Sequence, residues 1–301
     1  MKIGVIGMGR VGTSVAVSML HQGVARELLV HDLHAAVAEG EALDLAHGSA
    51  FYPSADIRVA AVEDMLDCDA VVIAAGRNGR ADETRLDLLR DNVRVVGELA
   101  RRLARLTGLL VIVSNPVDVL TQIAVEQSGL APARVLGTGT LLDTARLRHA
   151  IGRELAIDPR SVHAHVLGEH GDSEVVVWSS AQVGGVALRR WPGWTAAREL
   201  AISTEVRRAA YEIIRRKGAT NHAIGLATAA ALKWALRDER RVITISRIQE
   251  GVAGITGVAL SLPAIVGRDG AVEVIAPELD DEERAALARS AEALRTARAS
   301  L

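Results

Sequence analysis

The sequence predicts an α/β fold in which a parallel sheet, covered by helices on both faces, precedes a mixed α+β region. The first half contains short apolar segments bounded by turn residues, typical of buried strands, at residues 2–7, 27–31, 70–74 and 109–114. Longer helical patterns separate these segments, at residues 11–21, 36–45 and 87–106. The alternation of strand and helix indicates parallel strands, which bind ligands where their carboxyl ends meet.

The alternation ends near residue 140, so we place a boundary there between a first domain (residues 1–140) and a second domain (residues 141–301). Helices in the second domain are expected at residues 144–155, 196–217, 221–237 and 278–298. Strands are expected at residues 161–167, 174–178, 242–248, 258–262 and 271–274. Asp280 and Asp281 would favour the positive N-terminal end of the last helix. The second domain is therefore predicted to be a mixed α+β unit.

Composition and charge exclude several classes of protein. The chain has 301 residues, of which 49% are hydrophobic and 24% charged, and its net charge is −2. This balance argues against nucleic-acid binding, which needs a concentrated basic surface, and no apolar run reaches the ~20 residues that span a membrane. With no signal-peptide pattern and Cys68 as the one cysteine, we expect a cytoplasmic protein. The apolar helices at residues 11–21 and 221–237 indicate self-association.

A glycine turn follows the first predicted strand and opens the first predicted helix: Gly7-Met8-Gly9-Arg10-Val11-Gly12. In this spacing the first glycine permits a tight turn, the second lets the backbone approach a phosphate, and the third lets the helix pack closely. Asp32 ends the next strand, where a carboxylate accepts hydrogen bonds from ribose hydroxyls and repels a 2′-phosphate. These features predict a Rossmann domain that binds NAD. Alternatively, the glycines serve packing alone and Asp32 caps a helix.

A histidine between glycines, His170, ends a predicted strand within Leu167-Gly168-Glu169-His170-Gly171-Asp172-Ser173. Histidine exchanges protons near neutral pH, as the interconversion of an alcohol and a ketone requires. Asp143 begins a predicted helix and could orient the imidazole and stabilise its charge. Arg146 follows one turn later and could bind a substrate carboxylate through two parallel hydrogen bonds. Alternatively, His170 is structural and Asp143 forms an ordinary i,i+3 ion pair with Arg146.

The chain resembles the lactate/malate dehydrogenase family over essentially its whole length, and is most similar to its bacterial L-lactate branch. Beside the glycine turn, the resemblance rests on Glu83-Thr84-Arg85-Leu86-Asp87-Leu88, Ser114-Asn115-Pro116-Val117-Asp118, Gly139-Thr140-Leu141-Leu142-Asp143-Thr144-Ala145-Arg146 and Gly168-Glu169-His170-Gly171-Asp172-Ser173-Glu174. It implies a Rossmann domain, a mixed second domain, NAD as cofactor, and a dimer or tetramer. The implied reaction transfers hydride between NADH and a small 2-oxo acid.

The resemblance also implies roles for individual residues. His170 would donate a proton to the carbonyl, Asp143 would hold His170 and stabilise its charge, and Arg146 would bind the substrate carboxylate. Asn115 would orient the reacting oxygen beside the nicotinamide, and Arg85 would polarise the carbonyl.

Other positions correspond to the walls of the family's two ligand sites. Thr220 and Ile224 match residues that line the substrate and nicotinamide pocket. The cofactor site would also include Gly7, Gly9, Arg10, Val11, Gly12, Asp32 and Gly76.

The loop at residues 77–85, punctuated by Gly76 and Gly79, is expected to be a mobile lid that carries Arg85. At the position of Gly79, lactate enzymes tend to have glutamine and malate enzymes arginine. Enclosing the second carboxylate of oxaloacetate without a cation would cost several kcal/mol, so pyruvate is the favoured substrate. Arg77 or Arg80 could swing inward instead, which leaves malate dehydrogenase open, as well as a wider range of 2-hydroxy acids.

Three further possibilities concern regulation, metals and loss of catalysis. Bacterial lactate dehydrogenases often bind fructose 1,6-bisphosphate through an arginine and a histidine, which correspond here to Arg148 and His163. His163 and His165 share a strand face, but two ligands without a third do not indicate a metal site. A non-catalytic NAD sensor would have lost catalytic side chains such as His170 or Arg85, and both are present.

Overall fold

A large mixed sheet forms the centre of the molecule. The computed structural model describes residues 1–77 and 85–301, and within them the large sheet has the strand order β12-β11-β10-β6-β5-β4-β1-β2-β3. The parallel strands are β1 (Lys2–Ile6), β2 (Glu27–His31), β3 (Asp56–Val59), β4 (Ala70–Ile73), β5 (Leu109–Ile112) and β6 (Val135–Gly137). Their order, 6-5-4-1-2-3, has the two halves of a doubly wound sheet, so the predicted Rossmann fold is confirmed.

Two of these parallel strands were absent from the sequence-based prediction. β3 (Asp56–Val59) is an edge strand whose residues are mostly exposed, and β6 (Val135–Gly137) is only three residues long. Neither gives a long apolar run, which is the pattern that identifies a buried strand. The four predicted strands of the first half all form, within a residue or two of their expected ends.

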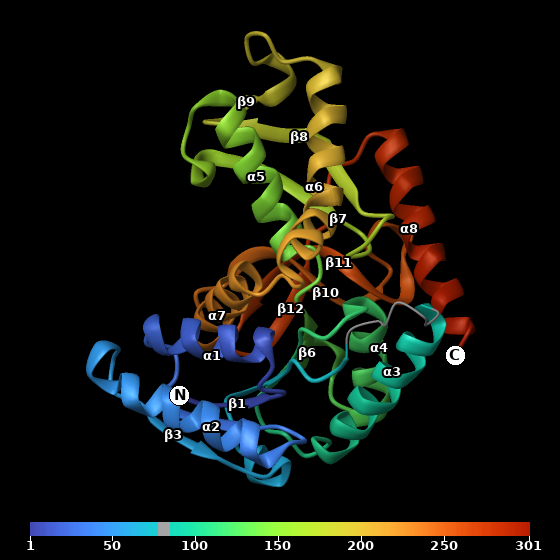
Figure 1. The fold of residues 1–301 in the computed structure, drawn as a ribbon. Helices are drawn as coiled ribbons and strands as arrows, with labels where there is room; N and C mark the ends of the chain where they lie inside the picture. The colour runs from blue at the N-terminus through green and yellow to red at the C-terminus, as the bar shows by residue number, and fades with distance from the viewer. Residues whose placement is uncertain (78–84) are drawn as a thin grey trace.

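Helices cover both faces of the parallel strands (Figure 1). The helices of the first half are α1 (Arg10–His21), α2 (Ala35–His47), α3 (Arg85–Arg102) and α4 (Val117–Ser128). Residues of α1 and α2 join one buried apolar cluster, whereas residues of α3 and α4 join another on the opposite face. Helix α4 was not predicted, although its N-cap is Pro116 and proline is common at the start of a helix.

The second half extends the same sheet rather than building a separate one. Strands β10 (Arg241–Glu250), β11 (Thr256–Gly267) and β12 (Gly270–Val274) are antiparallel to one another, and β10 pairs with β6 of the first half. The sheet therefore continues across residue 140, and the two halves share hydrogen bonds as well as side-chain contacts.

A smaller unit stands above the large sheet in Figure 1. It contains a three-stranded sheet of β7 (Val162–Leu167), β8 (Val175–Val183) and β9 (Val186–Ala187), packed on α5 (Leu141–Leu155) and α6 (Ala196–Lys217). The last helix, α8 (Asp281–Ala299), is capped at its N-terminus by Asp280, whose side chain accepts a hydrogen bond from the backbone N–H of Glu283. The predicted mixed α+β second half is thus present.

Helix α7 (His222–Leu236) packs against α1, so these two apolar helices cover part of each other's surface. Exposed apolar side chains remain on both, since Val17 of α1 is 50% exposed and Leu226 of α7 is 56% exposed. Among the helices of residues 1–77 and 85–301, none combines the length and apolar character needed to cross a bilayer.

Candidate active site

The glycine turn between β1 and α1 has the geometry that its spacing predicts. Gly7 has φ +95°, and a Cβ on Gly12 would lie 1.8 Å from the carbonyl oxygen of Gly7. Both positions therefore exclude larger residues. A Cβ on Gly9 would meet no atom within 4 Å, so the backbone there faces open space. Gly9 is also the N-cap of α1 and supplies no side-chain cap, which leaves the helix N–H groups for an anion.

Asp32 follows β2 and lies against the glycine turn. Its carboxylate accepts hydrogen bonds from the backbone N–H of Met8 (2.8 Å) and of His34 (3.0 Å). Asp32 thus secures the turn at the edge where a ribose would follow the pyrophosphate. An acidic group there disfavours a 2′-phosphate. The turn, the helix N-terminus and Asp32 together fit an NAD molecule.

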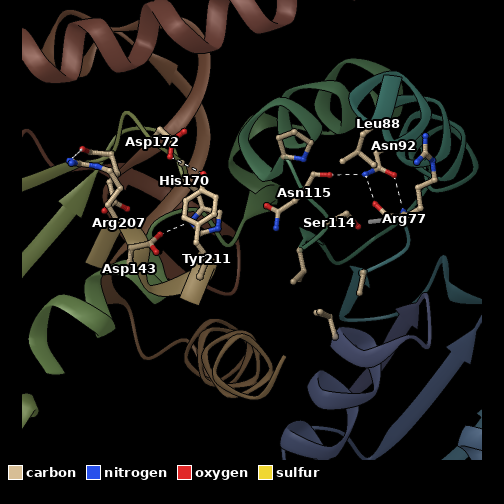
Figure 2. A pocket seen from close by; sticks show the side chains of 18 of the residues that line it. Arg77, Leu88, Asn92, Ser114, Asn115, Asp143, His170, Asp172, Arg207 and Tyr211 are labelled. Carbon is tan, nitrogen blue, oxygen red and sulfur yellow. Dashed lines mark hydrogen bonds and ion pairs between the residues drawn. The ribbon is translucent and has the colours of Figure 1, made fainter. Parts of the chain in front are cut away.

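A pocket of about 500 Å³ lies beside this turn, between the two halves of the chain. Val11 and Gly76 line it from the first half, where β1 and β4 end. Figure 2 shows Asn92, Ser114 and Asn115 on one side of it, and Asp143, His170 and Arg207 on the other. The predicted site residues Arg146 and Asn115 also line the pocket.

The carboxylate of Asp143 joins two predicted catalytic groups. Nδ1 of His170 donates a hydrogen bond to Oδ2 of Asp143 (2.5 Å), and Nη1 of Arg146 donates to Oδ1 (2.7 Å). Asp143 is 2% exposed, whereas a quarter of the His170 side chain (25%) reaches the surface of the pocket. The imidazole is therefore held at one nitrogen, and its other nitrogen is available to a ligand.

Electrostatics at this cluster favour a charged imidazole. Burial alone would lower the pKa of His170, but the carboxylate of Asp143 outweighs burial and raises that pKa to about 9. Burial likewise opposes the ionisation of Asp143, whereas His170 and Arg146 outweigh burial and lower the pKa of Asp143. The pair thus holds a proton on His170 at neutral pH.

Asp118, in α4, is a second carboxyl group behind His170 that sequence reasoning did not assign. Its Oδ2 accepts a hydrogen bond from the backbone N–H of His170 (2.7 Å), and the residue is 2% exposed. Burial raises the pKa of Asp118 to about 6, although the nearby Ser246 hydroxyl and the hydrogen bond from the backbone N–H of His170 oppose this shift. Asp118 belongs to the motif that carries Asn115, but its contact with His170 could not be inferred from sequence spacing.

Ser261 of β11 ties together the segments that carry His170 and Asp143. Gly168 and Ser261 exchange backbone hydrogen bonds of 2.9 and 3.0 Å. The hydroxyl of Ser261 accepts a hydrogen bond from the N–H of Thr140 (2.9 Å), which is the N-cap of α5. The large sheet therefore fixes the separation between the His170 loop and the helix that presents Asp143.

Asn92 of α3 fixes the backbone on the cofactor side of the pocket. Its Nδ2 donates to the carbonyl oxygen of Asn115 (2.9 Å), and its Oδ1 accepts from the N–H of Arg77 (3.0 Å). A Cβ on Gly76 would lie 3.2 Å from Oδ1 of Asn92. Arg77 forms an ion pair with Asp91 (2.7 Å).

Several predicted positions are not joined to this cluster in the described residues. Gly79 and Arg80 lie outside them, as does most of the predicted lid; α3 begins at Arg85, but the Arg85 side chain lies outside the described part. Thr220 and Ile224 are absent from the described lining of the pocket, and Ile224 packs against the core beside α1. Arg10 reaches across to the end of α6, where Nη1 donates to the carbonyl oxygen of Lys217 (3.5 Å).

The predicted effector residues lie elsewhere on the second half. Nε of Arg148, in α5, donates to the carbonyl oxygen of Ala164 (3.1 Å), and His163 is exposed on β7. Burial first, and then the neighbouring Arg148 and His163, lower the pKa of His165 to about 4. Among the described residues, no group of three His, Cys, Asp or Glu side chains is placed to hold a metal ion.

A dinucleotide turn beside a buried imidazole–carboxylate pair defines a nicotinamide-dependent dehydrogenase. Comparison with known proteins gives the family. Residues 1–137 match the lactate/malate dehydrogenase NAD-binding domain, and residues 140–300 match the α/β C-terminal domain of the same family. The chain therefore belongs to the lactate/malate dehydrogenase family, and the predicted family and cofactor are confirmed.

Individual relatives are similar over nearly their full length. The L-lactate dehydrogenase of Thermus aquaticus is 45% identical, over 100% of this chain and 99% of the relative. That of Synechococcus sp. (strain JA-3-3Ab) is 44% identical, over 98% and 97%. Among solved structures, the minor L-lactate dehydrogenase of Enterococcus mundtii has a TM-score of 0.97 at 37% identity, and the match covers 100% of this chain and 98% of that one.

The glycine turn yields a prediction with a matched control. Gly12→Ala should lower stability by about 1–3 kcal/mol, since its Cβ overlaps the carbonyl of Gly7, and should weaken NADH binding. Gly9→Ala should leave stability unchanged but raise the Kd for NADH at least about tenfold, because its Cβ enters the path of the phosphate. Thermal unfolding and NADH fluorescence titration measure both effects. If Gly12→Ala matched the wild type in both assays, the proposed turn geometry would be wrong.

The Asp143–His170 pair predicts a pH dependence. We expect His170 to donate the proton during reduction, so the rate at saturating substrate should be high below its pKa and fall as pH rises through about 9. Asp143→Asn removes the charge that raises this pKa, so the fall should move to lower pH and the rate at pH 7 should drop on the order of 10²- to 10⁴-fold. The control is Asp158→Asn, at an exposed ion pair with Arg160. An unchanged pH profile in Asp143→Asn would contradict the pairing.

Proposed function

We propose that the protein reduces pyruvate to L-lactate with NADH, as a glycolytic enzyme of the cytoplasm. The observation that carries the proposal is the position of His170, which is held by Asp143 in a pocket that adjoins the dinucleotide turn. Relatives named L-lactate dehydrogenase, at 40–45% identity over 98–100% of this chain, support the same reaction. The complete His170–Asp143–Arg146 cluster argues against a sensor that has lost catalysis.

The chain's own residues would bind the substrate and move one proton. Arg146 would bind the substrate carboxylate, Asn115 would orient the carbonyl oxygen, and Arg85 would polarise it. Bound NADH supplies the hydride that the carbonyl carbon accepts. The nitrogen of His170 that faces away from Asp143 would give its proton to the carbonyl oxygen, leaving a neutral imidazole that Asp143 still orients.

The lack of a cationic side chain at position 79 favours pyruvate over oxaloacetate. Gly79 supplies no cation for a second carboxylate, and Arg77 is already paired with Asp91. An uncompensated charge enclosed in the pocket would cost several kcal/mol. Because Gly79 has no side chain, larger monocarboxylic 2-oxo acids are a reasonable second class of substrate, whereas malate dehydrogenase activity requires another arginine to enter the site.

We also propose a homo-oligomer that responds to fructose 1,6-bisphosphate. Exposed Val17 and Leu226, on the packed helices α1 and α7, offer an apolar face for a second copy. Arg148 and His163, which both lie near His165, would contact the phosphates.

Substrate preference is tested by following NADH oxidation with pyruvate and, separately, with oxaloacetate. We expect kcat/KM for pyruvate to exceed that for oxaloacetate at least about tenfold, since a buried unpaired carboxylate costs more than 1.4 kcal/mol. Restoring a cation with Gly79→Arg should shift the ratio toward oxaloacetate. A wild-type preference for oxaloacetate would contradict the proposal and make the protein a malate dehydrogenase.

The effector proposal is tested at the exposed His163. Fructose 1,6-bisphosphate should lower the KM for pyruvate in the wild type, and His163→Ala should abolish the response while keeping kcat unchanged. Saturation curves with and without the bisphosphate measure both. Identical curves in the wild type would rule out the effector.

A further inference from the structure

Glu174 is a buried carboxyl group that lines the pocket and has no part in the reaction described above. Only 6% of the residue is exposed, and it borders the same pocket as Asp143, Arg146 and His170. Within residues 1–77 and 85–301, its Oε1 has no hydrogen-bond partner. A buried polar atom without a partner costs free energy, so this atom needs a functional explanation.

Arg207 of α6 is a neighbour of Glu174 and, among the described residues, also has a buried polar atom without a hydrogen-bond partner. Its Nη2 donates to the backbone carbonyl oxygen of Glu174 (3.4 Å), while its buried Nε finds no partner in the described part of the chain. Arg207 also lines the pocket. One region of the pocket wall therefore contains an unsatisfied donor and an unsatisfied carboxyl oxygen.

The groups that face Glu174 determine its charge. They are Asp143 and Arg146 from α5, Arg207 from α6, and His170 from the loop after β7. Burial first, and then repulsion by Asp143, raise the pKa of Glu174 to about 8, although the three cationic groups oppose this shift. Below that pH the carboxyl group is neutral, and its O–H can donate a hydrogen bond.

We propose that Glu174 is a specificity-determining residue, whose protonated carboxyl donates a hydrogen bond to the carboxylate of the incoming 2-oxo acid and whose ionised form repels it. The inference rests on the proposed reduction of a 2-oxo acid. When Glu174 is ionised, three carboxylates lie in the occupied pocket: those of Glu174, Asp143 and the substrate. Glu174 then competes with the substrate for Arg146 and Arg207. Binding therefore draws a proton from solvent onto Glu174 in the molecules in which it was ionised, up to one proton per site at high pH, and no covalent bond other than this O–H changes.

The variant Glu174→Gln separates this role from that of His170. Glutamine keeps a hydrogen-bond donor but cannot ionise, so substrate binding should lose the pH dependence due to Glu174. Between pH 7 and pH 9 the KM for pyruvate should rise more than about tenfold in the wild type, since pH 9 lies one unit above the pKa of Glu174. In Glu174→Gln the KM should rise only about twofold, because about half of His170 loses its proton by pH 9. The pH profile of kcat should be the same in both.

A matched control and a binding measurement complete the test. Glu282→Gln, at an exposed position in α8, should retain the wild-type KM profile. Calorimetry at pH 8 with the NADH complex and oxamate, an unreactive isostere of pyruvate, in two buffers of different ionisation enthalpy, should show proton uptake near one half per site in the wild type and little in Glu174→Gln. Thermal unfolding and NADH affinity verify that the variant is folded.

The outcomes distinguish this inference from the proposed function. Turnover of pyruvate with parallel KM profiles in the wild type and Glu174→Gln would overturn the role of Glu174 and leave the proposed function intact. A wild-type protein that reduces no 2-oxo acid would overturn both.

Discussion

The buried carboxylate of Asp143 has an imidazole on one oxygen and a guanidinium on the other, and the remaining features of the site depend on this arrangement. A buried carboxylate is tolerated only when cationic partners offset its desolvation. His170 and Arg146 supply that compensation, and in return each is oriented by the same acid. His170 thereby gains a proton that it holds at neutral pH, and Arg146 is held beside the substrate pocket. The proton donation proposed for His170 and the carboxylate binding proposed for Arg146 thus share one structural cause.

This arrangement requires that segments far apart in the sequence be held in fixed positions relative to one another. Asp143 begins a helix that follows β6, His170 follows β7, and Asp118 reaches His170 from α4 of the first half. Ser261 links two of these segments, because it bonds to Gly168 by its backbone and to Thr140 by its hydroxyl. The pairing of β10 with β6 makes that link part of one continuous sheet. The position of the catalytic pair is therefore set by the sheet rather than by the loops around the pocket.

Local chemistry was predictable from the sequence, whereas contacts between distant segments were not. The glycine turn, Asp32 and four of the six parallel strands follow from spacing and periodicity, and the structure has them as predicted. The loop with His170 was recognisable from its glycines and from family motifs. By contrast, Asp118 acts through a backbone N–H far along the chain, and Glu174 matters because of burial, which no short pattern reveals. The placement of Thr220 and Ile224 in the pocket remains a prediction from the family resemblance.

The most direct test of the account is the ionisation of His170 itself. NMR of protein labelled with ¹⁵N-histidine, with the His170 signals assigned from their loss in His170→Gln, would follow this imidazole through a pH titration in the presence of NADH. The account predicts a pKa of about 9, and a lower value in Asp143→Asn. A wild-type pKa near the ordinary value of about 6.5 would contradict it, because the buried carboxylate would then not be stabilising the charged form.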